Sequence, residues 1–247
     1  MDRLIYTAMS GASSTLGQQA SVAHNMANAT STGFKTELHK LRAVPVQNVQ
    51  MPTRAFVVDA SVANNMAAGP MQQTGSTFDM AVQGKGWFAI QMPDGSEAYT
   101  RNGSFQVSPN GILQTRSGNP VLGSGGPITI PPDVEISVGA DGSISTVARS
   151  GARNSTSGVD QLKLVNPPEA DLTRGADGLF RLASGDPAPA DPAVRVASGY
   201  LEGSNVNVVD QMVSMISLAR HYEMQTKMLS TAQEMDKSAA QLLTRGA

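Results

Sequence analysis

Histidine is the side chain here best suited to metal binding or acid–base chemistry, and the chain contains His24, His39 and His221. None has a second histidine or a carboxylate at a spacing that would bring two metal ligands onto one helix face. Glu223 follows His221 by two positions, so the two side chains would point to different faces of a helix. Cysteine is absent, which excludes disulfides, thiol nucleophiles and cysteine metal sites. The histidines are therefore predicted to lie on the surface or against neighbouring helices.

The glycine, serine and aspartate residues also lack the spacing of a catalytic site. The GKG at residues 84–86 has neither the upstream glycine of a P-loop nor the hydroxyl residue after its lysine, and GSGG at 123–126 is typical of a turn. The aspartates of the Asp-Gly pairs are typical of turns, where they bond to local backbone. No G-x-S-x-G motif occurs, and no pair of carboxylates is singled out. We predict that the chain is not an enzyme and needs no cofactor and no metal.

The composition of the chain argues against nucleic-acid binding and against insertion into a membrane. The 247 residues include 18 Lys and Arg against 20 Asp and Glu, and aromatic residues are 4% of the chain. A net charge of −2 gives no basic surface for a phosphate backbone, so nucleic-acid binding is disfavoured. The N-terminus has no basic leader followed by an apolar run, and no apolar run approaches the roughly 20 residues of a membrane span. We expect a soluble protein that stays inside the cell or leaves without a cleaved signal.

The N-terminal segment has the spacing of a helix that packs along another helix. Its apolar or small residues alternate in steps of four and three, at Ile5, Met9, Ala12, Leu16, Gln19, Ala23 and Met26. No charged residue lies between Arg3 and Lys35, whereas an exposed helix face normally carries charge. This composition favours a helix surrounded by other helices with close backbone approach. A helix of low stability that frays in the free chain is the alternative, and both can hold.

The C-terminal segment repeats this spacing over a greater length. One apolar stripe comprises Val208, Met212, Met215, Ala219, Tyr222, Thr226 and Leu229, and a second comprises Met228, Ala232, Met235, Ala239 and Leu242. Asn207 is a plausible N-cap, with Asp210 three residues on. These features predict a helix over residues 208–243. Since a two-helix hairpin buries one stripe on each helix, the other surfaces imply further copies or related subunits.

Between the helices the sequence predicts short strands separated by turns. The strand-like runs are residues 87–91, 97–100, 104–107, 111–113, 128–130, 135–138, 143–146, 162–165, 179–182 and 194–198. Asn-Gly or Asp-Gly pairs follow Pro93, Arg101, Pro109, Ala140 and Ala176, which is the strongest local signal for hairpins. We predict an α+β fold in which the terminal helices pair as an antiparallel coiled-coil-like hairpin beside a central all-β domain. The predicted divisions are an N-terminal helix (1–36), an extended connector with little core (37–78), the β domain (79–198) and the returning helix (199–247).

The phrase NMANATSTGFK at residues 25–35 is expected to form the junction between helix and β domain. Gly33 can adopt the left-handed conformation that ends a helix, and Phe34 can fold back on the last turn. The polar residues Asn28, Thr30, Ser31 and Thr32 can cap carbonyls or bond to neighbouring backbone. GYLEGSNV at 199–206 is the expected return of the chain.

Several of these phrases together resemble the bacterial flagellar rod and hook proteins. They are MDRLIYTAMSGASS, the ANxxTxGFK phrase, YTRNGSFQVSPNGIL, GxPVLGxxGPITIP and LEGSNVNVVDQMVSMISLARHYEMQTKML, which span most of the chain. Within that family the opening phrase and the length are most similar to the proximal-rod member, with the distal-rod protein FlgG as the alternative. The resemblance implies a structural axial subunit for motility, with paired terminal helices inside and β domains outside a helical assembly that transmits torque from motor to hook.

The resemblance also implies partners, location and interaction residues. The partners would be copies of the chain, the rod proteins FlgB, FlgC and FlgG, and the type III export apparatus, with no nucleic acid and no membrane insertion. The location would be the basal-body rod crossing the periplasm, reached without a cleaved signal peptide. The residues expected to carry assembly are Ile5, Met9, Ala12, Leu16, Ala23, Asn28, Thr32, Gly33, Phe34, Asn205, Val208, Met212, Met215, Ala219, Tyr222 and Leu229.

Overall fold

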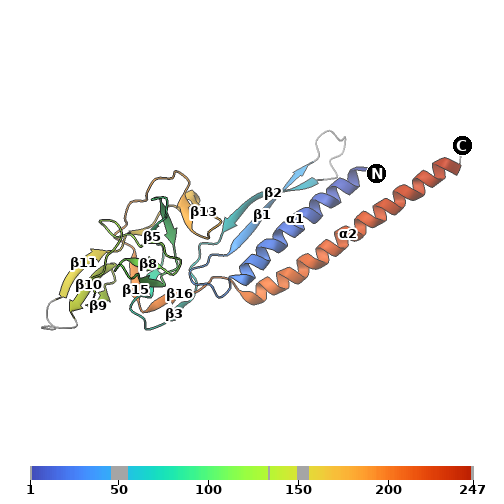
Figure 1. Cartoon of the computed structure of the whole chain (residues 1–247). Coiled ribbons are helices and arrows are strands. Elements are labelled where there is room, and N and C mark those ends of the chain that lie inside the picture. The colour runs from blue at the N-terminus through green and yellow to red at the C-terminus, as the bar shows by residue number, and fades with distance from the viewer. Residues whose placement is uncertain (1, 46–54, 133, 149–155, 246–247) are drawn as a thin grey trace. The chain divides into compact units, whose positions relative to one another are not determined.

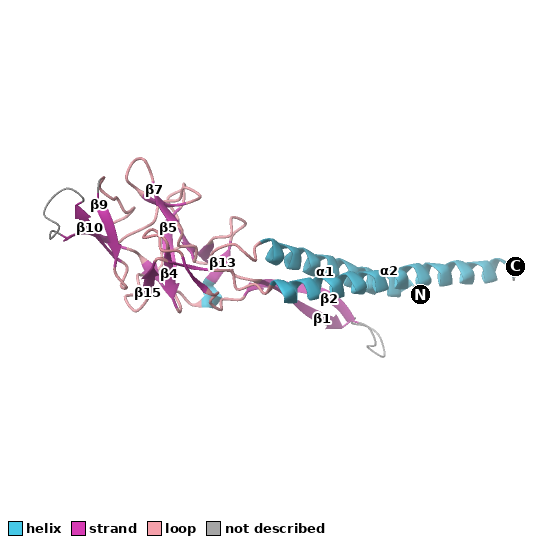
Figure 2. Cartoon of the chain, turned by 90° about the horizontal axis from the view of Figure 1, so that it is seen from below, coloured by secondary structure: helices cyan, strands magenta, loops and turns pink. Residues whose placement is uncertain are grey.

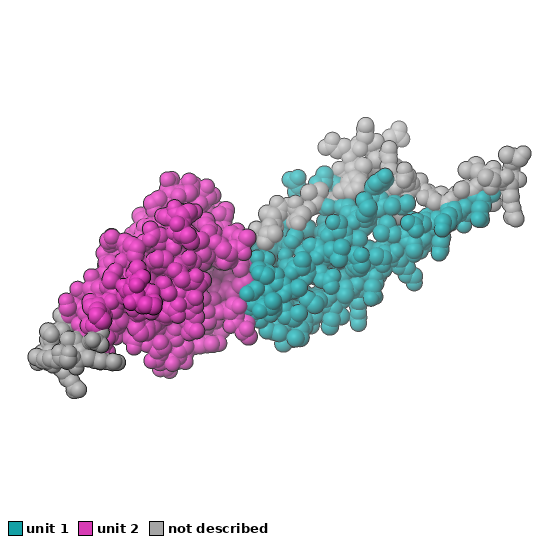
Figure 3. Space-filling model, viewed as in Figure 1, with its two compact units in different colours: residues 1–29, 36–65, 206–247 teal, residues 30–35, 66–205 magenta. Residues whose placement is uncertain are grey.

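A computed structural model describes residues 2–45, 55–132, 134–148 and 156–245 of the chain. The chain forms two compact units (Figure 3). Unit 1 comprises Met1–Ala29, Thr36–Asn65 and Val206–Ala247, and unit 2 comprises Thr30–Lys35 and Met66–Asn205. Both units are therefore built from segments that are far apart in the sequence.

Unit 1 contains two long helices and a β-hairpin. Helix α1 (Asp2–Ala27) and helix α2 (Val208–Arg245) lie side by side and run in opposite directions (Figures 1 and 2). Strands β1 (Glu37–Pro45) and β2 (Ala55–Asn64) pair antiparallel, with a register shift between Lys40 and Leu41. The Ser10 hydroxyl of α1 donates a hydrogen bond to the Val57 carbonyl of β2 at 2.8 Å. The hairpin therefore packs on α1 and belongs to the same core.

The start of α2 follows from its capping residue. The side-chain oxygen of Asn207 accepts a hydrogen bond from the Val209 backbone N–H at 3.0 Å, which satisfies one of the free N–H groups of the first turn. The Asn207 carbonyl accepts the first helical bond, from Gln211. The predicted N-cap and the predicted first residue of this helix are confirmed.

The expected coiled-coil-like hairpin is wrong as a description of the helical half of the fold. The α+β composition holds, but unit 1 is a helix pair with a β-hairpin on it, and α1 buries only part of the predicted seam. Within the predicted seam, Met9 and Leu16 are 54% and 49% exposed, whereas Ala12 is buried. Ala8, Thr15 and Asn25, which lie outside that seam, are also buried. Small and polar side chains let the backbones approach and form hydrogen bonds across the contact, so the buried face is not the most apolar face.

The segment at 37–78, expected as an extended connector, also differs from that expectation. It contains β1, β2 and a third strand, β3 (Met71–Gln73). Its apolar periodicity is weak because the described side chains of β1 are exposed or half-buried. Backbone pairing with β2 and packing on α1 order this segment, and neither is visible as a side-chain pattern.

Unit 2 holds the remaining strands. They are β4 (Met80–Gln83), β5 (Trp87–Gln91), β6 (Glu97–Thr100), β7 (Phe105–Val107), β8 (Leu113–Thr115), β9 (Val134–Val138), β10 (Ser143–Ala148), β11 (Thr156–Gln161), β12 (Leu164–Val165), β13 (Leu172–Arg174), β14 (Phe180–Leu182), β15 (Arg195–Ser198) and β16 (Tyr200–Glu202), with a short 3₁₀ helix at Glu169–Asp171. The largest sheet has the order β12-β5-β6-β14-β13, a second has the order β11-β10-β9, and β15-β4, β16-β3 and β7-β8 form antiparallel pairs.

Two hydrophobic clusters form the core of unit 2. One surrounds Phe88, Ile90 and Leu113, which are fully buried, and the other surrounds Trp87 and Tyr99. Residues on opposite faces of β5 serve different clusters, since alternate side chains of a strand point to opposite faces. Unit 2 therefore has a core of its own, formed on both sides of its main sheet.

Four of the five predicted hairpin turns join strands that do pair, namely β5-β6, β7-β8, β9-β10 and β13-β14. The turn at Arg101–Gly103 is the exception, because β6 pairs with β5 and β14 while β7 pairs with β8. Gly103 is needed for close approach: a Cβ there would lie 1.7 Å from the Met80 carbonyl oxygen. The predicted strand at 128–130 forms an isolated bridge instead, although Ile128 and Ile130 are buried.

Candidate assembly surfaces and the junction that supports them

Asn25 is the residue that ties the three parts of unit 1 together. It is 2% exposed, and its amide donates to the Glu37 carbonyl at 2.9 Å while its oxygen accepts from the Glu37 N–H at 2.8 Å. The same amide lies 3.4 Å from the side-chain oxygen of Gln211 on α2. Farther along α1, Thr15 donates to the side-chain oxygen of Gln225 at 3.1 Å. The contacts between these elements therefore include several specific polar ones.

Helix α2 presents two different faces. The half-buried face comprises Gln211, Met215, Leu218, Tyr222, Gln225, Leu229 and Ala232, in alternating steps of four and three. On the opposite side lie large apolar residues that are more than half exposed; we call these the α2 outer face, and they are Val209, Met212, Val213, Ile216, Met224, Met228 and Met235. No charged residue lies between Asp210 and Arg220. This surface is uncharged from Gln211 to Ala219, and exposed charged residues lie among the methionines farther along the helix. Exposed apolar surface of this kind is typical of a protein–protein contact.

Helix α1 has a smaller exposed apolar stripe. Tyr6, Met9 and Leu16 are about half exposed, and Ala20 and Ala23 continue the same spacing toward the end of the helix. The stripe carries no charged side chain. Its geometry fits close packing of another helix, because the alanines leave room for a neighbouring backbone.

The residues expected to carry assembly fall into three environments. Exposed on the helices are Met9, Leu16, Ala23, Val208 and Met212; buried or half-buried in unit 1 are Ile5, Ala12, Asn28, Met215, Ala219, Tyr222 and Leu229; buried or half-buried in unit 2 are Thr32, Gly33, Phe34 and Asn205.

Gly33 adopts the left-handed conformation, with φ +70°, but it does not end the helix. Helix α1 ends at Ala27, and the Gly33 N–H donates to the Glu202 carbonyl at 2.7 Å. A Cβ at Gly33 would lie 2.4 Å from the Asn102 backbone nitrogen. The glycine is therefore required both by its φ angle and by the close approach of residues 101–102.

Phe34 and Thr32 are also held by unit 2. The guanidinium of Arg174 lies 4.5 Å from the centre of the buried Phe34 ring, a cation–π contact. Thr32 donates to the side-chain oxygen of Asn102 at 2.9 Å. The Asn205 side chain donates to the Ala67 carbonyl at 3.0 Å. The outgoing chain, the returning chain and the 66–70 segment thus meet in one place.

At the centre of this junction lies a cluster of buried charges, Lys35, Arg101 and Glu202, which we call the buried ion cluster. One Glu202 oxygen accepts from the Lys35 Nζ at 2.6 Å and the other from the Arg101 Nη1 at 2.9 Å. The three side chains are 1%, 4% and 1% exposed for lysine, arginine and glutamate respectively. The Gly69 N–H also donates to Glu202, at 3.0 Å. The Glu202 carboxylate therefore binds two cations and one backbone N–H, and it connects four segments that are distant in the sequence.

The groups around Lys35 and Arg101 offset only part of the free-energy cost of burying the two positive charges. Burial lowers the pKa of Lys35, and the hydrogen bond and charge of Glu202 oppose that shift. Burial lowers the pKa of the Arg101 guanidinium in the same way. Lys35 also donates to the Ala67 carbonyl and Arg101 to the Gly84 carbonyl, at 2.8 and 2.6 Å. The Arg101 Nε has no hydrogen-bond acceptor in the described part of the chain, so the cluster is not fully satisfied.

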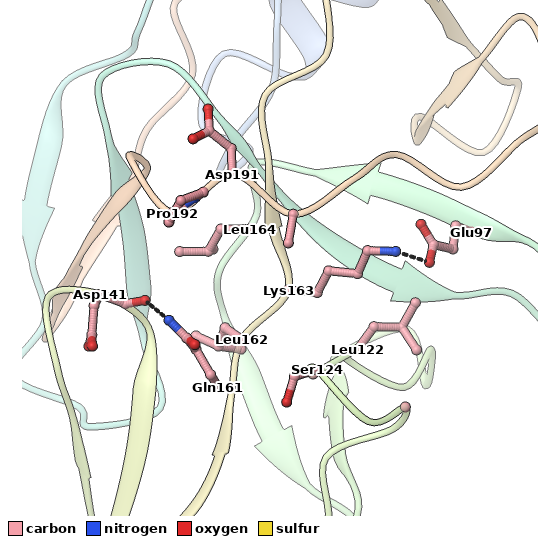
Figure 4. A pocket seen from close by; sticks show the side chains of 13 residues that line it. Glu97, Leu122, Ser124, Asp141, Gln161, Leu162, Lys163, Leu164, Asp191 and Pro192 are labelled. Carbon is pink, nitrogen blue, oxygen red and sulfur yellow. Dashed lines mark hydrogen bonds and ion pairs between the residues drawn. The ribbon is translucent and has the colours of Figure 1, made fainter.

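Unit 2 also contains a cavity of about 400 Å³ that could be taken for a ligand site (Figure 4). Lys163 forms an ion pair with Glu97, and Gln161 donates to the Asp141 carbonyl at 3.0 Å. The Asp141 carboxylate accepts from Ser143, which lowers its pKa as expected for a turn aspartate. Over the described ranges no group of histidines or carboxylates could hold a metal ion. The charged and polar groups named here thus have structural partners within unit 2.

The buried ion cluster was not predicted from the sequence. Each of its members is a charged residue inside a phrase otherwise rich in small residues: GFK, TRNG and LEGS. A single charged residue in an uncharged phrase was the one sign in the sequence that these positions are buried. The sequence does not show that the three residues meet, because neighbouring members are at least 66 positions apart, the separation of residues 35 and 101. Nothing local relates them.

Among the described residues, neither helix combines the length and apolar character that crossing a membrane requires.

Comparison with known proteins gives two family matches. Residues 197–242 match the model described as the flagellar basal body rod FlgEFG protein C-terminal, and residues 81–146 match that of the flagellar hook protein FlgE/F/G D1 domain. The first match covers the return of the chain and most of α2; the second covers the strands from β4 to β10.

Curated relatives match along the whole chain. The flagellar basal-body rod protein FlgF of Escherichia coli is 47% identical, and that of Salmonella typhimurium 45%, each over 99% of both chains. The flagellar basal-body rod protein FlgG of Buchnera aphidicola from Schizaphis graminum is 30% identical over 90% of this chain and 92% of its own. These relatives are named as rod proteins, and the FlgF relatives have the higher identity. The chain therefore belongs to the FlgF family of flagellar basal-body rod proteins.

Proposed function

We propose that this chain is a structural subunit of the proximal rod, which joins copies of itself and related rod proteins in a helical assembly. Its role would be mechanical: the assembly is the drive shaft that transmits torque from motor to hook. The observation that carries the proposal is the α2 outer face, an exposed apolar surface on a helix whose opposite side is already packed. Exposed apolar surface of this kind is typical of a site that binds another protein.

The two helices would contribute differently to the contact. The α2 outer face offers long, flexible side chains, and methionine adapts to partners of different shape. The α1 stripe at Tyr6, Met9, Leu16, Ala20 and Ala23 mixes large and very small side chains. A neighbouring helix could therefore approach α1 closely while its own apolar residues cover the larger side chains.

The junction would support assembly indirectly. Gly33, Phe34 and the buried ion cluster order the outgoing and returning chains within unit 2. The half-buried residues Met215 and Tyr222 order the helix pair within unit 1. On this proposal, changes in these residues reduce assembly by disordering the subunit, whereas changes in the outer faces reduce it with the subunit folded.

Family membership supports a proposal for the partners and the location. We propose FlgB, FlgC and FlgG as neighbours, the flagellar type III apparatus as the export route, and the basal-body rod in the periplasm as the location, reached without a cleaved signal peptide. A role in the distal rod is the second candidate, favoured by the FlgG relative that matches 90% of the chain. The role requires no catalytic step.

Photo-crosslinking in assembled basal bodies tests the proposal. A photoreactive amino acid at Val213 or Ile216, on the α2 outer face, should form crosslinks to other rod subunits. The same amino acid at Asp94, in an exposed turn of unit 2, is the control for general proximity. Crosslinks to FlgB or FlgC would support the proximal rod, and crosslinks to FlgG alone the distal alternative. If both helix positions crosslink no more than Asp94, the α2 outer face is not an interface.

A further inference from the structure

The methionines of this chain are distributed unequally between buried and exposed positions. Met80 is 1% exposed in the core of unit 2, whereas Met224, Met228 and Met235 on α2 are 54%, 52% and 56% exposed. Met71, on β3 in unit 2, is also exposed. The chain therefore contains both protected and accessible thioethers.

Three of the accessible thioethers share one face of a helix. Met224, Met228 and Met235 are spaced by four and seven residues, and at 3.6 residues per turn these steps place them in a line along α2. They form the C-terminal half of the α2 outer face. Met215, on the opposite side of the helix, is half-buried. Met212, which is 51% exposed, adds a fourth accessible sulfur to the α2 outer face, while Met9 on α1 and Met71 on β3 are exposed elsewhere.

We propose that Met224, Met228 and Met235 form an oxidation-sensitive modification site, at which a peroxide converts the unassembled subunit into a form that cannot join the assembly. The inference rests on the proposed assembly role of the α2 outer face. The reactive class is a hydroperoxide, and hydrogen peroxide is the simplest member.

The chemistry is an oxygen transfer. A lone pair of the methionine sulfur attacks the terminal peroxide oxygen, an S–O bond forms and the O–O bond breaks. The proton of the attacked oxygen passes to the departing oxygen, which leaves as an alcohol, or as water when the oxidant is hydrogen peroxide. Sulfur loses two electrons and the peroxide gains two. The product, methionine sulfoxide, is polar and chiral, and it is returned to methionine by methionine sulfoxide reductases with thiols as reductant.

The physical effect follows from the position of the sulfurs. Each sulfoxide oxygen needs hydrogen bonds, which water supplies on the free subunit and an apolar contact does not. Oxidation therefore leaves the free subunit folded, since Met80 is protected, but disfavours burial of the face. In the assembled state the same sulfurs would be covered. The site would distinguish subunits awaiting assembly from subunits already in place.

The first measurement is the order of oxidation in the purified full chain. After a short exposure to hydrogen peroxide, peptide mass spectrometry should find sulfoxide at Met224, Met228 and Met235 at least about tenfold sooner than at Met80, because susceptibility follows exposure. Equal rates at Met80 and at the three α2 methionines would overturn the inference at this step.

The second measurement is association of the full chain by sedimentation velocity, before and after peroxide. The wild type should lose association, and reductase with thiol should restore it. The triple variant Met224→Leu, Met228→Leu, Met235→Leu is made in a chain that also carries Met9→Leu and Met212→Leu, because these two exposed methionines lie on the proposed contact surfaces as well. This variant should associate before and after treatment. Met71→Leu is the matched control, and it should remain as sensitive as wild type because its exposed methionine lies outside α2.

A charged variant separates failure of this inference from failure of the assembly role. If Met228→Asp prevents association but oxidised wild type associates normally, the face is an interface and the modification site is refuted. If Met228→Asp associates as wild type does, or if the reduced chain does not associate at all, the assembly role of this face fails and the inference fails with it.

Discussion

Replacing Glu202 by glutamine tests whether the buried ion cluster holds unit 2 together. Glutamine has nearly the same shape but no charge, so Lys35 and Arg101 would remain buried without a counter-ion. Removing one partner of a buried ion pair typically costs about 3–5 kcal/mol, because the remaining charge is left uncompensated. The cost here should lie within that range, since both cations keep a carbonyl acceptor at Ala67 and Gly84.

The chain supplies its own probe for this measurement. Trp87 is the single tryptophan, it is buried in unit 2, and the Arg101 guanidinium lies 5.3 Å from the centre of its ring. Urea unfolding of the full chain, followed by tryptophan fluorescence, therefore reports on unit 2. With a urea dependence of about 2 kcal/mol per molar, the midpoint should fall by roughly 1.5–2.5 M at an unchanged slope.

The matched control is Glu169→Gln, the same chemical change in a surface pair. Glu169 lies 3.1 Å from the Lys85 ammonium, with side chains 53% and 79% exposed for glutamate and lysine respectively. Exposed pairs contribute about 0–1 kcal/mol, so its midpoint should move little. If Glu202→Gln also shifts the free energy of unfolding by less than about 1 kcal/mol, the cluster is not the structural centre inferred here.

The companion experiment replaces all three charges together. Lys35→Met, Arg101→Met and Glu202→Leu in one chain should recover much of the stability lost in Glu202→Gln, because apolar replacement of a whole buried ion cluster is often neutral or stabilising. No recovery would mean that the hydrogen bonds to carbonyls and the Gly69 N–H contribute more than the charges cost.

The other predictions concern the junction and unit 1. Gly33→Ala should lower the tryptophan-detected urea midpoint more than Gly75→Ala does, because both glycines have φ near +70° but a Cβ is obstructed only at Gly33; equal shifts would contradict the steric argument. Asn25→Ala should destabilise unit 1 by about 1–3 kcal/mol and speed hydrogen exchange at the Glu37 amide, and unchanged exchange would refute the pairing. Burial lowers the pKa of Lys35, so the unfolded chain binds more protons than the folded chain as pH rises toward 10.5. The free energy of unfolding of wild type, measured by urea titration, should therefore rise with pH relative to that of Lys35→Met. A fall would contradict the direction of the pKa shift.

The parts of the fold that were predictable have local causes. The start of α2 depends on one capping residue, Asn207, and the pairing of β5 with β6 on a turn that a single Asp-Gly pair specifies. Spacing of apolar residues identified both helices because a helix brings residues three and four apart onto one face. These causes act within a few residues of each other.

The parts that were missed depend on contacts between distant segments. Spacing shows that a helix has an apolar stripe but not which face packs within the subunit, and in α1 polar contacts from Thr15 and Asn25 belong to the buried face. The β1-β2 hairpin depends on backbone pairing whose side chains carry little pattern. No sequence pattern indicates that the three charges of the buried ion cluster, Lys35, Arg101 and Glu202, lie together in the fold.

The hydrogen bond between the Gly33 N–H and the Glu202 carbonyl also shortens the loop that must close when α1 pairs with α2. Helix α1 ends at Ala27 and α2 begins at Val208, so their direct pairing would close a loop of roughly 180 residues. Once unit 2 has joined residues 33 and 202, roughly a dozen residues separate the two helix ends along the shortened path. Loop-closure entropy then falls by roughly 2 kcal/mol, since it scales with the logarithm of loop length. A fold with its helices at opposite ends of the sequence thereby acquires the short effective contact order of a local hairpin, provided that the β unit folds first.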